Sequence, residues 1–582
     1  MGHAIGYNQI GPSKGKIRVV ISSRVFVAVV FGVAIVLSAT VGLHSEWAEC
    51  GNPVIIAEGR QSSPAACPDG SGGTIISWNT VDEGGYFDVY AQRLDSQGNI
   101  QWLENGIPVR VAEGCQRNRG IVPDGSGGAI VVWLAGCVGD DEDIWASHID
   151  ANGSVVGAAD GYPICTAPYR QTWIVALPDN EGGAYIVWED WRSGSRQVYA
   201  QRIDSECNTL WQDDGIPVCA LPTGQAYPCS ALGNDGGIIV AWQDYRNHEL
   251  YIENWDIFAQ RINGQGSLMW NSAGVPICTL PSKQAYPSIA SDGDGGAYIC
   301  WQDDRAHLGY NDIYVQRIDS MGVAIWEANG LPACSADGTR WHPQIVSAFE
   351  HDAVVVWYDS NGDVYAQAVH PDGSMEYGAS GFGVCTAPGD QRTPSVCNNG
   401  CGDIIIAWAD YRVLPGRGYI QLLDHEGVFA LEQNGIPVCP GEQPLSRPTM
   451  CADGFGGIVG VSINESQNEG DLFAKKLLLP QAITDTRIAL APAILKQNYP
   501  NPFNPSTTIE YYLPQKREVT LEILDINGRL IRRYHRGSED AGTHRIVWSG
   551  LNAHGDQTAS GIYLYRLIAG QTVIARKMVL LK

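Results

Sequence analysis

The segment Tyr286–Cys334 reads YPSIASDGDGGAYICWQDDRAHLGYNDIYVQRIDSMGVAIWEANGLPAC. It contains a short apolar segment, the glycine-rich turn DGDGG, and an apolar strand that ends at Trp301. An alternating strand follows from Asp312 to Asp319, and a turn at Asn329-Gly330 leads into a short final segment. Short apolar or alternating runs separated by glycine turns, where a positive φ is needed, predict four antiparallel strands.

This unit recurs along most of the chain. Its central tryptophan returns every 51 to 59 residues, and serine takes its place in the eighth unit: Trp78, Trp133, Trp188, Trp242, Trp301, Trp357, Trp408 and Ser462. Four-stranded units of this length, repeated around a ring, predict a β-propeller. A solenoid is the competing repeat architecture, but its repeats are usually shorter.

The two ends of the repeat favour a closed ring. The last unit ends after its third strand, Asp471 to Leu478. The first unit is preceded by Gly51–Ile55, which matches the fourth-strand segment Gly215–Cys219 of another unit. We therefore expect an all-β fold in which an eight-bladed propeller, residues 50–479, is closed by an N-terminal strand.

Composition and charge narrow the classes of partner. The chain of 582 residues has 68 Gly and 18 Trp, as many short strands joined by glycine turns require. Residues 50–480 carry 21 Lys and Arg against 53 Asp and Glu, a net charge of −32, whereas residues 486–582 carry 13 against 7, a net charge of +6. The acidic body argues against nucleic acid or an anionic membrane as partner. It is compatible with calcium, and we expect no other cofactor.

Residues 1–49 carry a targeting signal. Lys14, Lys16, Arg18 and Arg24 precede an apolar run from Val25 to Leu43, the order of a secretory signal peptide. This run of 19 residues is also long enough to span a bilayer, so an uncleaved membrane anchor is the alternative.

The 16 cysteines follow the repeat rather than a disulfide framework. One fourth-strand position recurs in six units: Cys165, Cys219, Cys278, Cys334, Cys385 and Cys439. Equivalent positions on different blades lie beyond the roughly 7 Å Cα separation that a disulfide allows. We expect buried, small apolar side chains at these positions. A few other cysteines, such as Cys397 and Cys401, could pair.

Acidic and basic side chains follow the central tryptophan at fixed offsets. Four units have Asp two residues later and Arg four residues later: Asp190 and Arg192, Asp244 and Arg246, Asp303 and Arg305, and Asp410 and Arg412. A repeated ion pair that orders the loop or locks neighbouring blades is the favoured interpretation. A ring of carboxylates that binds calcium or sugar hydroxyls is the alternative. Catalysis requires one asymmetric site, so the repetition predicts no catalytic residue.

Aromatic residues in the variable loops are the better binding candidates. The longest loop, after Trp242, contains Tyr245, Tyr251 and Trp255, and the next unit carries Tyr310. Flat aromatic rings beside carboxylates suit sugar rings or peptide. Ordinary packing of the loops is the alternative interpretation.

A separate module follows a linker of residues 480–496. Residues 497–582 begin with QNYPNPFNPSTTI and continue as six alternating strands, with a hairpin turn at Asn527-Gly528. Six or seven short strands in fewer than a hundred residues predict an Ig-like sandwich.

This module resembles two known families. The segments NYPNPFNP, DINGR, SGIY and KMVLLK resemble the type A C-terminal sorting domain of type IX secretion substrates. The stretch from Trp548 to Tyr563 also resembles the Ig-like domain of the FlgD hook-capping family. The resemblance implies export and recognition by the type IX secretion machinery. The sorting elements that it implies are Asn527, Gly528, Gly561, Tyr563, Lys577 and Lys582.

Together these patterns predict a secreted or outer-surface protein whose propeller binds a carbohydrate or protein ligand without catalysis. A glycan-active hydrolase of propeller fold is the first alternative, because that fold also hosts enzymes. It would require two carboxylates roughly 5–10 Å apart in a pocket. A structural surface-layer protein is the second alternative. The expected membrane contact is limited to the N-terminal segment or to surface attachment.

Overall fold

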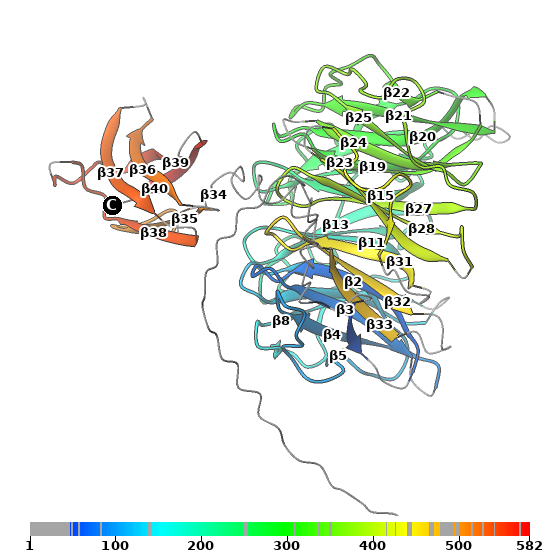
Figure 1. The fold of residues 1–582 in the computed structure, drawn as a ribbon, viewed down its shortest axis with the longest axis horizontal. Coiled ribbons are helices and arrows are strands. Elements are labelled where there is room, and N and C mark those ends of the chain that lie inside the picture. The colour runs from blue at the N-terminus through cyan, green and yellow to red at the C-terminus, as the bar shows by residue number, and fades with distance from the viewer. Residues whose placement is uncertain are drawn as a thin grey trace, which may run out of the picture. The chain divides into compact units, whose positions relative to one another are not determined.

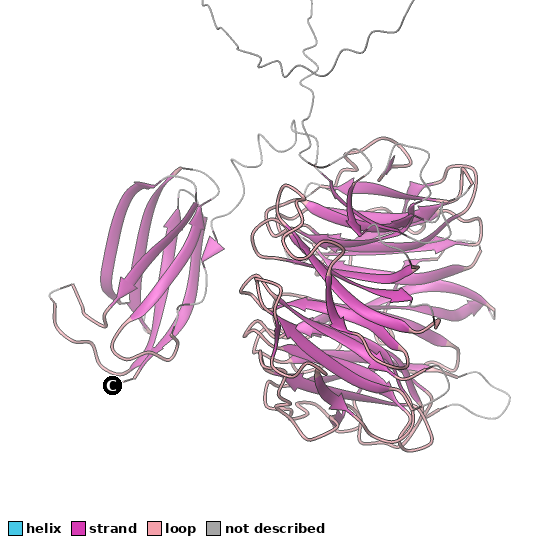
Figure 2. Ribbon diagram, turned by 90° about the horizontal axis from the view of Figure 1, so that it is seen from below, coloured by secondary structure: helices cyan, strands magenta, loops and turns pink. Residues whose placement is uncertain are grey.

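A computed structural model describes residues 47, 51–55, 59–81, 84–137, 141–247, 254–307, 309–335, 338–348, 352–414, 416–424, 427–438, 445–464, 471–477, 494–495, 498, 500–513, 516–526, 529–539, 542–553, 555–569 and 572–581. In this part of the chain the secondary structure is entirely β, and no helix could span a membrane (Figures 1 and 2). The predicted signal or anchor lies outside the described residues, apart from Trp47.

Eight small antiparallel sheets follow one another between residues 52 and 477, and we number them 1 to 8 along the chain. Sheets 1 to 4 contain β2 (Gln61–Pro68), β3 (Thr74–Val81), β4 (Phe87–Leu94) and β5 (Ile107–Arg110); β6 (Gln116–Pro123), β7 (Ala129–Ala135), β8 (Asp143–Ile149), β9 (Val155–Val156) and β10 (Tyr162–Cys165); β11 (Gln171–Pro178), β12 (Ala184–Asp190), β13 (Gln197–Ile203) and β14 (Ile216–Pro217); and β15 (Gln225–Leu232), β16 (Ile238–Asp244), β17 (Asp256–Ile262) and β18 (Val275–Cys278).

Sheets 5 to 8 contain β19 (Gln284–Ser291), β20 (Ala297–His307), β21 (Tyr310–Ile318) and β22 (Leu331–Cys334); β23 (Arg340–Ser347), β24 (Ala353–Asp359), β25 (Val364–Val369) and β26 (Phe382–Cys385); β27 (Gln391–Asn398), β28 (Ile404–Asp410), β29 (Arg417–Leu423) and β30 (Ile436–Pro437); and β31 (Leu445–Ala452), β32 (Ile458–Asn464), β33 (Asp471–Leu477) and β1 (Asn52–Ile55). In sheet 8 the N-terminal strand β1 pairs with β33, at the place where the other sheets have a fourth strand of their own.

The core lies between the sheets. In β12 of sheet 3, alternate residues face opposite neighbours: Ile186 and Trp188 pack against sheet 2, whereas Tyr185 and Val187 pack against sheet 4. Each sheet is packed in this way against the next one, and one further cluster joins sheet 8 to sheet 1. Because both faces of the second strands are buried, these strands are continuous apolar runs rather than alternating ones.

The turn before the fourth strand is fixed by the central tryptophan. Gly330 has φ +81°, and a Cβ at this position would lie 2.5 Å from the Trp301 ring. A Cβ at Gly215 would likewise lie 2.3 Å from the Trp188 ring. Glycine is therefore required at this place both by the left-handed backbone and by the close approach of the ring.

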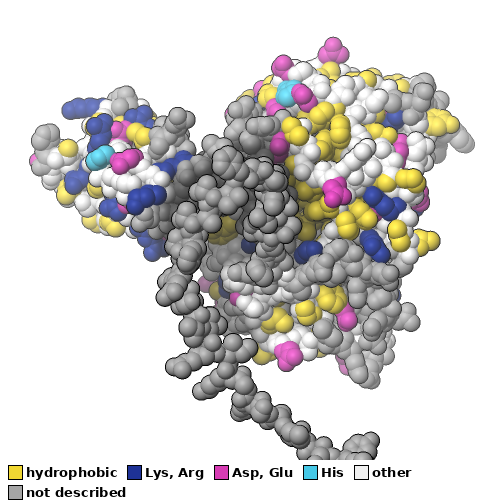
Figure 3. Space-filling view, viewed as in Figure 1, with side chains coloured by type: hydrophobic (Ala, Val, Ile, Leu, Met, Phe, Trp, Pro, Cys, Tyr) yellow, Lys and Arg dark blue, Asp and Glu magenta, His cyan; other side chains and the backbone are white. Residues whose placement is uncertain are grey.

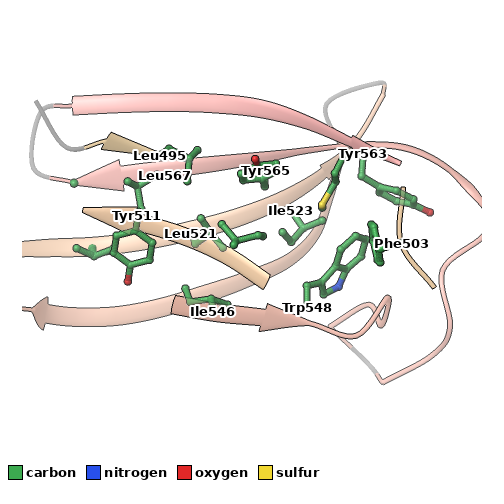
Figure 4. Close-up of a cluster of buried hydrophobic side chains, with 14 of the residues drawn as sticks. Leu495, Phe503, Tyr511, Leu521, Ile523, Ile546, Trp548, Tyr563, Tyr565 and Leu567 are labelled. Atoms are coloured by element: carbon green, nitrogen blue, oxygen red, sulfur yellow. The ribbon is translucent and has the colours of Figure 1, made fainter. Parts of the chain in front are cut away.

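The C-terminal module has two antiparallel sheets around one core (Figure 4). The sheets contain β34 (Ile494–Leu495), β35 (Thr507–Leu513) and β38 (Gly542–Trp548), and β37 (Leu530–Glu539), β36 (Arg517–Asp525), β39 (Gly561–Ala569) and β40 (Thr572–Leu580). Trp548, Tyr565 and Leu521 are fully buried between them. On the surface of this module, Lys and Arg side chains are prominent, in keeping with its positive charge (Figure 3).

The packing of β1 predicts that it is as important for stability as an ordinary fourth strand. Val54 of β1 is fully buried, and Val109 has the same position in β5 of sheet 1. We expect Val54→Ala and Val109→Ala each to lower the free energy of unfolding by roughly 2 kcal/mol, through lost methyl burial and a residual cavity. Denaturant unfolding measures both. An unchanged midpoint for Val54→Ala, beside a lowered one for Val109→Ala, would show that β1 is dispensable.

Candidate functional site

The variable loops and the beginnings of the first strands lie at the same end of each sheet. In sheet 4, Gln225 at the start of β15 pairs with Asp244 at the end of β16. The same register relates Gln284 to Asp303 in sheet 5. We call this end the loop end. Side chains that begin the first strands can therefore meet side chains from the variable loops.

Each first strand is interrupted by a bulge near its start. In sheet 4 the register shifts between Ala226 and Cys229, and Tyr227 within the bulge has φ +52°. Residues other than glycine occupy this left-handed region at the equivalent place in six sheets: Ser63, Trp173, Tyr227, Tyr286, His342 and Thr393. Bulky residues adopt such a backbone only where the surrounding structure holds them in it, and this strain is commonly found at functional sites.

Side chains from the preceding sheet hold some of these bulges. The carboxylate Oε1 of Glu189 in β12 accepts the backbone N–H of Tyr227 at 2.7 Å. Gln302 in β20 accepts the N–H of His342 at 2.8 Å in the same way. The residue that follows the central tryptophan thus fixes the first strand of the next sheet.

Four of the bulge residues are aromatic, and they form a continuous row with Tyr358 from the end of β24. We define the aromatic row as Trp173, Tyr227, Tyr286, His342 and Tyr358. Successive ring centroids lie 4.8, 4.7, 5.6 and 5.9 Å apart. Trp173 is 52% exposed, and the side chain of His342 is also exposed. The row crosses sheets 3 to 6 and presents ring surfaces to solvent.

Cationic groups lie beside this row. The guanidinium of Arg196 lies over the rings of Tyr227 and Tyr245, at 5.9 and 5.5 Å from their centroids. The ammonium of Lys283 lies 4.0 Å from the ring centroid of Trp255. Burial raises the pKa of the Tyr245 hydroxyl, against the effect of Arg196, so this hydroxyl is a hydrogen-bonding group at neutral pH.

Two of the predicted ligand-binding residues lie near the row. The ring centroids of Tyr245 and Trp255 lie 5.3 Å apart. The guanidinium of Arg196 lies over the rings of both Tyr245 and Tyr227. Tyr310 is 58% exposed and faces His307 across the hairpin between β20 and β21, with no described ring contact to the row. Tyr251 lies outside the described residues. Ligand binding by these four residues remains a prediction.

The residues of the row were not predicted from the sequence. A signal for them exists, because Trp173, Tyr227 and Tyr286 each lie two residues after a glutamine that begins a first strand. His342 occupies the same place after Arg340. An aromatic residue at a constant offset in a repeat, outside the apolar strand, would have identified the position.

The repeated Asp and Arg residues form structural ion pairs. In sheet 3, Asp190 is fully buried, and its Oδ2 accepts the indole N–H of Trp188 at 2.8 Å. Arg192 donates to both carboxylate oxygens, at 2.8 and 2.6 Å, and lies over the ring of Tyr199. The Trp–Asp hydrogen bond and the arginine bond to Oδ2 recur at Asp244, Asp303 and Asp410. These buried carboxylates are already satisfied within the protein, which supports the structural interpretation over a carboxylate ring for ligands.

The fourth-strand cysteines complete these ion pairs from the neighbouring sheet. Arg192 of sheet 3 donates to the Sγ of Cys165 in sheet 2 at 3.2 Å, and Arg412 of sheet 7 donates to Cys385 in sheet 6 at 3.0 Å. Burial raises the pKa of the Cys165 thiol to about 12. These thiols are buried, as expected, and Cys439 lies outside the described residues. Cys397 and Cys401, like the other described cysteines, form no disulfide in the structure, and the first thiol is partly buried and the second exposed.

Among the described residues, no group of three or more His, Cys, Asp or Glu side chains is arranged to hold a metal ion. The glycine-rich turns are held internally instead. Asp69 accepts the backbone N–H groups of Ser71 and Gly73 through Oδ1, and its Oδ2 pairs with Arg93. Calcium binding elsewhere remains a prediction.

The NPFNP segment of the C-terminal module is paired with the last strand, β40. Phe503 of the NPFNP segment packs against Trp548, and its backbone bonds to Val579 and Leu581 on either side. Of the sorting elements, Gly561 begins β39, Tyr563 is buried against Trp548, and Lys577 is an exposed residue of β40. Asn527, Gly528 and Lys582 lie outside the described residues.

Comparison with known proteins supports the predicted Ig-like fold of the C-terminal module. Residues 504–572 match the FlgD Ig-like domain family, so the chain carries a C-terminal Ig-like domain. A search of curated proteins found no significant match.

Solved structures resemble the fold distantly. The polysaccharide lyase Uly1 is 10% identical, with a TM-score of 0.40, over 67% of this chain and 94% of the lyase. A PL25 ulvan lyase is 11% identical, with a TM-score of 0.39, over 64% and 96% of the two chains. PorZ, a type IX secretion surface component of Porphyromonas gingivalis, is 9% identical, with a TM-score of 0.25, over 90% and 93%.

The environment of Glu189 predicts a pH-dependent stability. Burial raises the pKa of this carboxyl, although the N–H of Tyr227, the charge of Arg196 and the hydroxyl of Thr172 oppose the shift. The folded protein therefore holds the proton more tightly than the unfolded chain does. Ionisation costs stability above the raised pKa, and this cost disappears below the ordinary pKa of about 4.3.

We expect Glu189→Gln to melt at or above the wild-type temperature at pH 7, because an amide oxygen can still accept the Tyr227 N–H, as Gln302 does for His342. The difference should shrink as the pH falls towards about 4. Melting curves at both pH values, with the exposed Glu104→Gln as control, measure this. A variant that is less stable than wild type at pH 7 would contradict the assignment.

Proposed function

We propose that residues 50–479 form an eight-bladed β-propeller closed by β1. The sheet 8 to sheet 1 contact supports this closure, because it repeats the contacts between the other sheets. Trp102 of sheet 1 donates its indole N–H to Ala151 O of sheet 2 at 3.2 Å, and Trp47 donates to Ser96 O of sheet 1 at 3.1 Å. Trp47 precedes Gly51 by the same four residues that separate Trp102 from Gly106. On this proposal residues 480–496 are a linker and residues 497–582 a separate domain.

We propose further that the propeller is a binding protein whose ligand is a carbohydrate chain. The observation that carries this proposal is the aromatic row, five rings in mutual contact across four sheets. The apolar face of a sugar ring stacks on an aromatic ring, and successive rings of an oligosaccharide can occupy successive aromatic residues. Arg196 and the hydroxyl of Tyr245 supply hydrogen-bonding groups at the side of the row.

The rigid backbone support of the aromatic row favours binding of an ordered ligand. Trp173 and Tyr227 belong to bulges with left-handed backbone, and the carboxylate of Glu189 fixes the second of these. Rings held before the ligand arrives lose little conformational entropy when it binds. Adaptable loops would be expected to show no such support from the sheets.

A glycan-active hydrolase is the second candidate, and Glu189 is the observation that favours it. It is a buried carboxyl with a raised pKa beside the row, as a general acid requires. Asp190 and Asp244, the buried carboxylates that follow the central tryptophans of sheets 3 and 4, are engaged by Arg192 and Arg246. Binding without turnover therefore remains the preferred proposal, and a surface-layer role is the third.

The binding proposal predicts the effect of removing an exposed ring. Trp173→Ala should weaken glycan binding roughly fivefold or more, since a stacked aromatic residue commonly contributes above about 1 kcal/mol. Phe455→Ala is the matched control, because Phe455 is also 52% exposed and lies in the turn at the opposite end of sheet 8.

A glycan array with the full chain identifies the ligand, and titration calorimetry then compares the variants. Equal affinity for wild type and Trp173→Ala, or an array without any bound glycan, would refute the proposal. Turnover of the bound glycan that is lost in Glu189→Gln would replace it with the hydrolase.

We also propose that the protein is exported to the cell surface or secreted, with the C-terminal domain as its type IX sorting signal. The N-terminal basic and apolar segment and the Ig-like domain at residues 504–572 support this route. The proposed partners are the secretion machinery and the propeller's ligand. The strongly acidic propeller does not suit nucleic acid.

The sorting proposal predicts that residues 497–582 suffice for transport. Fused to a signal-bearing reporter in a host with type IX machinery, they should bring the reporter to the cell surface, where added protease cleaves it. The same fusion with Trp548→Asp, which places a charge in the domain core, should fail. Retention of the reporter inside the cell despite a folded domain, or surface delivery of the protein without residues 497–582, would contradict the proposal.

A further inference from the structure

Sheet 2 lacks the ion pair that follows the central tryptophan in sheets 3, 4, 5 and 7. After Trp133, the position of the aspartate is occupied by Ala135, and the position of the arginine by Cys137. The indole N–H of Trp133 bonds instead to Gln116 at 3.1 Å. The loop after β7 is therefore without the contact that orders the corresponding loops of these sheets.

A second cysteine faces Cys137 at this place. Cys115 immediately precedes β6, and its carbonyl accepts the backbone N–H of Gly136 at 2.9 Å. The two sulfur atoms lie 2.8 Å apart. Non-bonded heavy atoms at optimal contact lie about 3.5–4.0 Å apart, so these sulfurs are closer than simple packing allows.

We propose that Cys115 and Cys137 form a disulfide bond in the exported protein. The bond would join the beginning of β6 to the loop after β7, within one sheet, and would replace the Asp–Arg ion pair of sheets 3, 4, 5 and 7. This inference depends on export to an oxidising compartment, where disulfides form and persist. It does not depend on the ligand of the propeller.

Three fourth-strand cysteines show how this pair differs from the repeated cysteine position. Cys165, Cys278 and Cys385 are buried, and the sulfur of each lies 3.0 to 3.2 Å from an arginine nitrogen of the next sheet. They fill the space beside an ion pair. Cys137 lies in the arginine position itself, next to a second thiol and partly exposed.

The exposure of the two thiols indicates the order of the reaction. Cys137 is partly exposed, whereas Cys115 is buried. The Cys137 thiolate attacks an external disulfide, such as that of an oxidised dithiol oxidoreductase or of glutathione, and one external thiolate leaves. The Cys115 thiolate then attacks the mixed disulfide at the Cys137 sulfur and releases the second. Two protein thiols and one external disulfide give one protein disulfide and two external thiols, so the external disulfide takes up both electrons.

The bond would also support the aromatic row. The loop after β7 leads to Glu142, which pairs with Arg117 of β6 and with Arg170. The carbonyl of Glu142 accepts the N–H of Gln171 at 3.1 Å, two residues before Trp173. Glu142 follows Cys137 by five residues, so a bond that anchors Cys137 would also restrain the start of β11, which carries the first ring of the row.

The direct test is the chemical state of the two thiols. The full chain is purified without reductant, incubated with oxidised glutathione, denatured in the presence of N-ethylmaleimide and digested. We expect mass spectrometry to find Cys115 and Cys137 in one cross-linked pair of peptides, with Cys385 alkylated. Alkylation of both thiols, or a cross-link of either one to a different cysteine, would overturn the proposal.

Variants give a second measurement. The wild-type melting temperature should fall by roughly 3–6 °C on reduction, because the bond closes a loop of the unfolded chain. Cys137→Ser should melt at one temperature with or without reductant, and the exposed Cys401→Ser should keep the wild-type shift. The double variant Ala135→Asp, Cys137→Arg restores the ion pair and should also melt independently of reductant. A shift on reduction that persists in Cys137→Ser would assign the effect to other cysteines and refute the inference.

Discussion

Burial of both faces of every small sheet is the constraint on which this molecule depends. A four-stranded sheet of this size encloses no core of its own, and its apolar side chains are buried only when a sheet lies on each side. The central tryptophans show this most clearly, since Trp188 and Trp242 are fully buried at the contact of one sheet with its neighbour. The same contact between neighbouring sheets is repeated along the chain. This repetition explains the positive-φ glycines, the buried ion pairs and the position of β1.

The strands and turns of the fold could be predicted from the local sequence pattern, because apolar runs, alternating runs and glycine turns recur in the same order in each repeat. The strand expected to end at Trp301 extends to His307, because His307 pairs with Tyr310 at the hairpin between β20 and β21. The predicted third strand of the last unit and the observed β33 both begin at Asp471, and residue 478, where the predicted strand ends, lies outside the described residues. The C-terminal module contains the six expected strands, β35 to β40, and the Ig-like assignment is supported by the family match.

The candidate site was harder to predict because it is made between repeats. The rings of Tyr227 and Tyr286 are in contact although 59 residues separate them in the sequence. A bulge orients each ring, and the local sequence does not predict that bulge. Tyr245 and Trp255 could be selected from loop composition alone, and they lie beside the row. Tyr310 was selected by the same argument and projects from a hairpin instead. Composition identifies which rings are available, whereas the contacts between sheets decide which of them meet.

The pairing of β1 with β33 has a consequence for the order of events during folding. β1 is synthesised before any of the eight sheets, yet its partner ends only at Leu477, so its pairing is the most non-local contact of the repeat region. Such contacts form late and slowly, because the entropy of closing a long loop is lost before the contacts contribute any stabilising free energy. Until then the edge of β33 is open to other chains. The pairing of β1 with β33 is therefore the step of folding at which strand addition by a second chain would compete most directly with the native structure.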